Sequence, residues 1–213
     1  MESNWTSGRV YKMSNGIMRL AYVNLLWILF SCVGLVIFGV FPATAALFAV
    51  IRKWQTEEDD IPIFNTFVQT YKKEFIKANV LGLFLTVIGY TLYFDYVYVS
   101  ILQGTSQIIM SFLLVLFAII YVTIALNIFP VFVHYDVKLL QNIKHAFYIG
   151  IANPLYTLMM VAAIVVLSLL LKYIPGLLPF FFPSIYALVL MKIGLQSFEK
   201  IVEKQEDYGV VQP

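Results

Sequence analysis

Polar side chains recur at helical spacing within long apolar stretches of this sequence. Asn24 and Ser31 are seven residues apart in the first stretch, and Asn79, Gly82 and Thr86 follow at intervals of three and four in the next. Such spacings place side chains on one face of a helix. In a membrane, polar groups on such a face can bind a neighbouring helix, or they can line a pocket suited to a neutral, hydroxyl-rich ligand.

Four tyrosines surround the carboxylate that lies nearest to an apolar stretch. Tyr90, Tyr93, Tyr96 and Tyr98 flank Asp95. Tyrosines are common where a helix leaves the membrane, and tyrosine faces beside a carboxylate would also suit a sugar ring. The candidate substrate-binding residues are therefore polar positions in or near the apolar stretches: Asn24, Asn79, Tyr93, Asp95, Asn127 and Asn153.

The motifs of common catalytic sites are absent from the sequence. It contains no G-x-x-x-x-G-K-[ST] loop, no H-E-x-x-H zinc motif and no G-x-S-x-G nucleophile. His134, Asp136 and His145 are a conceivable metal trio, but two histidines eleven residues apart are also ordinary for a loop at a membrane surface. We therefore expect no metal, no cofactor and no catalytic residue, and we expect that the protein is not an enzyme.

The composition indicates which elements must position these residues. Of the 213 residues, 61% are hydrophobic and 12% are charged, whereas soluble domains have about 45–50% apolar and about 25% charged residues. The chain is therefore expected to be an integral membrane protein with the lipid bilayer as its first partner. A water-soluble enzyme, a nucleic-acid binder and a disordered chain are excluded.

Five stretches without Lys, Arg, Asp or Glu supply candidate membrane spans, each of which needs about 20 mostly apolar residues. They cover residues 20–51, 78–94, 96–133, 146–171 and 173–191. Polar residues 103–106 predict a turn inside the third stretch, and Asn153-Pro154 predicts a kink in the fourth.

The first stretch, residues 20–51, is too long for one ordinary span and is interrupted by Gly34, Gly39 and Pro42. Basic residues accumulate on the cytoplasmic side of a membrane. A single crossing with the N-terminus outside would leave four of the 14 Lys and Arg residues outside, whereas a hairpin would leave Lys172 alone there. We therefore predict a hairpin and cytoplasmic N- and C-termini.

These features predict an all-α fold. It would be a polytopic transmembrane bundle with about six membrane-inserted helices, of which the first two form the hairpin. We expect one multi-pass domain of the cell membrane, residues 1–213, with cytoplasmic segments at 1–19, 52–77 and 196–213.

The connector at 52–77 is itself patterned. Acidic residues 57–60 precede Phe64, Phe67, Tyr71 and Phe75, which recur at helical spacing, and lysines follow. This pattern predicts an amphipathic helix in the plane of the membrane interface, with its aromatic side chains toward lipid or protein. The alternative is a docking surface for a cytoplasmic partner.

Three sequence blocks carry a resemblance to a known family. They are Phe-Pro-Ala-Thr-Ala-Ala-Leu at 41–47 with Arg-Lys-Trp at 52–54, then Ile-Phe at 63–64 with Phe67 and Tyr-Lys-Lys-Glu-Phe at 71–75, then Phe-Pro at 129–130 with His-Tyr-Asp at 134–136. Together they resemble the YesL family of bacterial membrane proteins of unknown function. The resemblance spans nearly the whole chain.

The resemblance implies a role in carbohydrate uptake, since genes of this family often lie beside those for sugar ABC transporters and polysaccharide degradation. It implies no catalytic residue. We therefore expect an accessory membrane component of a carbohydrate uptake or utilisation system, with sugar ABC-transporter subunits as partners. The alternative is a small-solute binding or transport component, similar to the substrate subunit of an energy-coupling transporter, that docks its partner through the small residues Ala45 and Ala49.

Overall fold

The structure is a computed structural model that describes residues 3–56, 61–173, 176 and 178–207. The acidic start of the connector, residues 57–60, lies outside this part of the chain. The described residues contain no β-strand. Their α-helices are α1 (Ser3–Val33), α2 (Val40–Thr56), α3 (Ile63–Ile101), α4 (Thr105–His134), α5 (Leu139–Ala152), α6 (Pro154–Tyr173) and α7 (Leu178–Asp207). The predicted all-α fold is confirmed.

Within the residues that the structure describes, five helical segments are long and apolar enough to cross a membrane. They are Ser14–Val33 in α1, Phe75–Ile101 in α3, Thr105–His134 in α4, Pro154–Tyr173 in α6 and Phe181–Lys204 in α7. Most of their side chains are not buried inside the protein. Large exposed apolar surfaces of this kind are stable in lipid and not in water, so the chain is a helical membrane protein.

Helices α1 and α2 form a hairpin. The chain reverses at residues 34–39, where Leu35 and Val36 have positive φ angles of 57° and 63°. A Cβ atom at Gly39 would overlap the backbone of Ser31, so the tight reversal requires glycine there. Along the pair, Trp27 Nε1 donates a hydrogen bond of 3.0 Å to Thr44 Oγ1. The hairpin predicted from the distribution of basic residues is therefore present.

Helix α2 is the centre of the core, although its 17 residues make it shorter than the five candidate spans. Ala43, Ala45 and Ala46 are fully buried, as are the larger Leu47 and Ile51. The small side chains allow close approach of neighbouring helices. Helix α2 packs against α1, α3, α4 and α7.

Helix α3 differs from the prediction in its continuity. The predicted amphipathic segment and the following span form one helix of 39 residues, about 58 Å long at about 1.5 Å per residue. No proline or glycine interrupts it between Ile63 and Leu81. The aromatic side of its first part packs on the protein, because Phe67 is buried and Tyr71 Oη donates to the Phe30 carbonyl oxygen at 3.1 Å.

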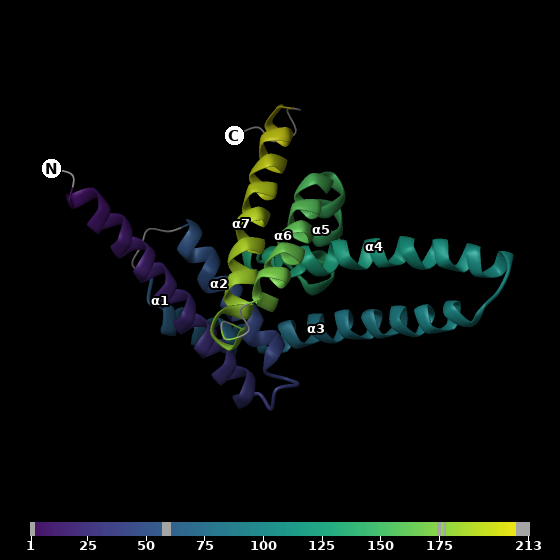
Figure 1. Ribbon diagram of the computed structural model, residues 1–213, viewed down its shortest axis with the longest axis horizontal. Helices are drawn as coiled ribbons and strands as arrows, with labels where there is room; N and C mark the ends of the chain where they lie inside the picture. The colour runs from purple at the N-terminus through teal and green to yellow at the C-terminus, as the bar shows by residue number, and fades with distance from the viewer. Residues whose placement is uncertain (1–2, 57–60, 174–175, 177, 208–213) are drawn as a thin grey trace.

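The remaining helices surround this centre. Figure 1 shows α3 and α4 leaving the body of the protein as a long antiparallel pair, while α6 and α7 run in a different direction. Between α5 and α6, the predicted kink is a complete break at Asn153, whose φ and ψ are −132° and 68°. Helix α7 continues to Asp207, so the predicted polar tail begins as the last turns of a helix.

Candidate functional site

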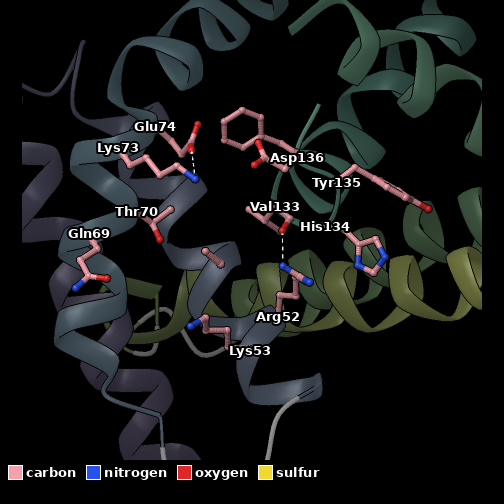
Figure 2. A pocket seen from close by; sticks show the side chains of 12 residues that line it. Arg52, Lys53, Gln69, Thr70, Lys73, Glu74, Val133, His134, Tyr135 and Asp136 are labelled. Carbon is pink, nitrogen blue, oxygen red and sulfur yellow. Dashed lines mark hydrogen bonds and ion pairs between the residues drawn. The ribbon is translucent and has the colours of Figure 1, made fainter. Parts of the chain in front are cut away.

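A charged pocket of about 300 Å³ lies where three helix segments meet (Figure 2). These are the C-terminal end of α2, the first turns of α3 and the C-terminal end of α4 with the residues that follow it. The pocket is lined by Ala49, Arg52, Lys53, Gln69, Thr70, Lys73, Glu74, Phe132, Val133, His134, Tyr135 and Asp136. Its polar side chains come from three separate parts of the sequence, of which the first contains Arg52 and the last Asp136, so the fold must assemble them.

Helix α2 supplies Arg52 and Lys53 at its exit from the core, directly after the buried Val50 and Ile51. Arg52 Nη1 donates a hydrogen bond of 2.8 Å to the carbonyl oxygen of Val133. Its Nε atom is buried without a hydrogen-bond acceptor. Lys53 forms no ion pair within the described residues. The pocket therefore contains cationic donors that the protein itself does not fully use.

Helix α3 supplies four polar side chains from a single face. Gln69, Thr70, Lys73 and Glu74 recur at spacings of three and four. The carboxylate oxygens of Glu74 form ion pairs with Lys73 Nζ and Lys77 Nζ, each at 3.5 Å. Because two lysines share its carboxylate, the negative charge of Glu74 is already balanced. Within the described residues, the side chains of Gln69 and Thr70 make no hydrogen bond.

The end of α4 supplies the opposite wall. The helix stops at His134, and the backbone of Tyr135 is extended, with φ −108° and ψ 126°. The His134 ring lies 4.7 Å from the rings of Tyr135 and Phe198, measured between centroids, and its Nδ1 atom is buried without a partner. Burial raises the pKa of the Tyr135 hydroxyl above its ordinary value, so the phenol stays neutral.

Metal binding by the histidines has no support in the described part of the chain. No group of three His, Cys, Asp or Glu side chains there is close enough to hold an ion. His145 lies against the ring of Tyr135, at 5.7 Å between centroids. The two histidines are thus packed with aromatic rings at one end of the bundle.

Three of the predicted substrate-binding residues are buried and bonded within the protein. Asn24 Oδ1 accepts a hydrogen bond of 3.4 Å from the backbone N–H of Ser184, the residue that follows Pro183 in α7. Asn127 Nδ2 donates to the Thr123 carbonyl oxygen, one turn earlier in α4. Asn153 Nδ2 donates to the Ser197 carbonyl oxygen at 3.0 Å. These contacts connect helices or satisfy backbone groups, as polar residues in a membrane bundle must.

The other three predicted residues lie along α3, outside the charged pocket. Asn79 Nδ2 donates to the carbonyl oxygens of Phe38 and Phe75, and thereby holds the α1–α2 turn against α3. Tyr93 and Asp95 are exposed on the far part of α3. Asp95 borders a separate groove between α3 and α4 that is otherwise largely apolar. The structure does not bring the six predicted residues together into one site.

The charged pocket was not among the predicted sites. Its segments are separate in the sequence, where the patterns predict a connector, a helix end and a loop. One feature of the sequence did point to it, because the three blocks that carried the family resemblance contain Arg52 and Lys53, then Lys73 and Glu74, then residues 134–136. The structure places all three blocks around one cavity.

Comparison with known proteins identifies the family of this chain. Residues 20–96 match the family described as "Protein of unknown function, DUF624". The chain is 40% identical to the uncharacterized protein YteU of Bacillus subtilis (strain 168) over 195 residues, which cover 91% of this chain and 86% of YteU. It is 38% identical over 205 residues to the uncharacterized protein YesL of the same organism, covering 92% of this chain and 96% of YesL.

A third relative, the uncharacterized protein YesV of Bacillus subtilis (strain 168), is 36% identical over 200 residues, covering 94% of this chain and 96% of YesV. The chain therefore belongs to the YesL-like family, whose function is unknown. No solved structure matches the chain.

Proposed function

We propose that this chain is an accessory membrane protein of a carbohydrate uptake or utilisation system, without catalytic activity of its own. The carbohydrate context rests on the family resemblance. The structural observation that supports an accessory role is the convergence of the three family-like blocks on one charged pocket at the end of the bundle. A polar site in this position can receive a ligand or a partner group from the aqueous phase.

The pocket faces the cytoplasm in this proposal. Arg52 and Lys53 lie at the end of α2, Lys73 and Lys77 in the first half of α3, and Lys138 directly before α5. Basic segments are retained on the cytoplasmic side. The protein would then lie in the cell membrane with both termini inside. The candidate partners on that side are the subunits of a sugar ABC transporter.

A second candidate function is a small-solute binding component, and the volume and polar lining of the pocket favour it. The similarity to an energy-coupling transporter subunit is less well supported. Its docking surface would need exposed small residues, but Ala45 is fully buried within the chain and Ala49 lines the charged pocket. The small residues of α2 therefore contact other helices of the same chain, and not a partner protein.

Copurification from native membranes tests the accessory role. A tagged full-length chain should retain the permease subunit of a sugar ABC transporter through mild detergent extraction. Deletion of the gene should slow growth on the oligosaccharide that this transporter imports, and not on glucose. Lys73→Gln, which changes the pocket, should restore growth less well than Lys72→Gln, which changes an exposed lysine beside it. Equal growth of the deletion strain and the parent on every polysaccharide tested would refute the proposal.

A further inference from the structure

The charged pocket is lined by more basic side chains than carboxylates. Arg52, Lys53 and Lys73 line it, against Glu74 and Asp136. Glu74 is shared between Lys73 and Lys77, at 3.5 Å from each. Asp136 is exposed and forms no ion pair within the described residues. The cavity therefore carries an excess of positive charge that a bound anion would balance.

The geometry of Arg52 leaves part of its guanidinium available. Nη1 is fixed by the Val133 carbonyl oxygen at 2.8 Å. Nε is buried without a partner, so Nη2, which donates to no acceptor in the described chain, is the nitrogen left for a ligand. Nη2 can donate a charge-assisted hydrogen bond to an oxygen of a carboxylate or phosphate. Because Nη1 is already held, little side-chain freedom would be lost when an oxyanion binds.

The rest of the lining suits hydroxyl groups. Gln69 offers an amide with two donors and an acceptor, Thr70 offers a hydroxyl, and Asp136 offers carboxylate oxygens. The first two make no hydrogen bond within the described residues. Figure 2 shows Gln69, Thr70 and Lys73 on one wall, with Arg52 and Asp136 placed across from them. The volume of about 300 Å³ is at the small end for ligand pockets, which suits a molecule the size of one sugar unit.

We propose that the pocket binds a small hydroxylated anion, namely a sugar acid or a sugar phosphate. The anionic group lies between Arg52, Lys53 and Lys73, and the hydroxyl groups face Gln69, Thr70 and Asp136. This inference rests on the second candidate function, solute binding, and not on the partnership with a transporter. A failure to bind anions would therefore leave the copurification and growth results standing.

Direct binding tests the inference. The purified full-length chain, in nanodiscs of phosphatidylcholine, is titrated with glucose, inorganic phosphate, glucuronate and glucose 6-phosphate at millimolar concentrations. We expect saturable heat and a raised unfolding temperature with glucuronate or glucose 6-phosphate, weaker binding of inorganic phosphate and no effect of glucose. Removal of one charge-assisted contact should weaken binding about tenfold or more.

Matched lysine variants separate the pocket from general surface charge. Lys73→Gln and Lys53→Gln should weaken binding, whereas Lys72→Gln, which removes an exposed charge one residue from Lys73, should not. These positions are only partly buried or exposed, so the variants are expected to fold, and their unfolding temperatures without ligand check this. Equal weakening by Lys72→Gln would overturn the assignment to this pocket.

Two further results would overturn the chemistry. Inorganic phosphate that binds as tightly as glucose 6-phosphate would contradict a role for the hydroxyl-binding groups. Stabilisation by phosphatidylglycerol in the nanodisc that is lost in Lys73→Gln, together with no response to any soluble anion, would identify the ligand as an anionic lipid headgroup instead. Absence of binding by the parent protein to every soluble anion would refute the proposal.

Discussion

Arg52 Nη1 donates a hydrogen bond of 2.8 Å to the carbonyl oxygen of Val133, which lies 81 positions later in the chain. The bond joins the end of α2 to the last turn of α4, where the carbonyl groups of a helix lack partners within the helix. It therefore fixes the wall of the charged pocket that continues into His134, Tyr135 and Asp136. A guanidinium is suited to this place because Nη1 can hold the carbonyl while Nη2 stays free to donate to a ligand.

Loss of this bond should destabilise the protein. Arg52→Gln leaves the Val133 carbonyl oxygen without its charged donor, and we expect a loss of about 1–3 kcal/mol in the free energy of unfolding. The midpoint of thermal unfolding in detergent measures it. Lys53→Gln is the control, because Lys53 forms no ion pair within the described residues. If the two variants unfold at the same temperature, the Arg52 bond does not stabilise the fold.

Close helix packing at Gly82 gives a second prediction. A Cβ atom there would overlap the ring of Phe41, so α2 and α3 could not keep their separation. Gly82→Ala gains about 1 kcal/mol from helix propensity, but overpacking typically removes about 1–3 kcal/mol. We therefore expect a net loss of stability, measured as a lower unfolding temperature in detergent.

The control for Gly82 is another glycine within a helix. At Gly16 of α1, the nearest atom to an added Cβ is in Trp54, at 3.9 Å, which is an ordinary contact. Gly16→Ala should therefore leave stability unchanged or raise it. A Gly82→Ala protein that is as stable as Gly16→Ala would show that the Phe41 ring moves aside at no cost.

The sequence predicted the local elements better than their assembly. The distribution of basic residues along the whole chain indicated the α1–α2 hairpin. Asn153-Pro154 indicated the end of α5, because the effect of proline on a helix is local. The continuity of α3 was missed, since the polar pattern before Ala78 suggested an interfacial helix. What decides its environment is the packing of Phe67 and Tyr71 on Phe30, a contact between distant segments.

The site was the least predictable part. For Asn24, Asn127 and Asn153, the sequence left open whether they contact neighbouring helices or line a ligand pocket, because polar groups in lipid need partners of either kind. The structure provides those partners from within the chain, at the proline of α7, along α4 and at the α5–α6 break. By contrast, the polar residues of the charged pocket lie at helix ends, where solvent alone could satisfy them. Only their assembly in three dimensions distinguishes them from ordinary surface charge.

Asn153 should accordingly act in stability. It donates to Ser197 and accepts a 3.0 Å hydrogen bond from Lys204 Nζ, so it holds the α5–α6 break against α7. We expect Asn153→Ala to lose about 1–3 kcal/mol in the free energy of unfolding. Asn65→Ala, at an exposed position of α3, should lose much less. Both values come from unfolding in detergent, and a large effect of Asn65→Ala alone would contradict this assignment.

The orientation in the membrane can be measured with single cysteines. Cys32 is exposed and would itself react, so the single cysteines are introduced into a Cys32→Ser variant. Ser14→Cys lies at the start of the candidate span in α1, near Arg19, and Thr56→Cys is the last residue of α2, near Arg52 and Lys53. Gln103→Cys lies in the turn between α3 and α4. Because basic segments stay in the cytoplasm, an impermeant thiol reagent added to intact cells should label Gln103→Cys only.

Permeabilised cells provide the control, since all three cysteines should then react. Labelling of Thr56→Cys in intact cells would place the charged pocket outside, and its ligand would then be an extracellular one. Labelling of Ser14→Cys, with Thr56→Cys protected, would mean that α1 and α2 cross as one unit despite the hydrogen bond between Trp27 and Thr44. The first result would remove the cytoplasmic partner from the proposed function, whereas the second would keep the pocket in the cytoplasm and refute only the hairpin; neither affects the anion-binding experiment.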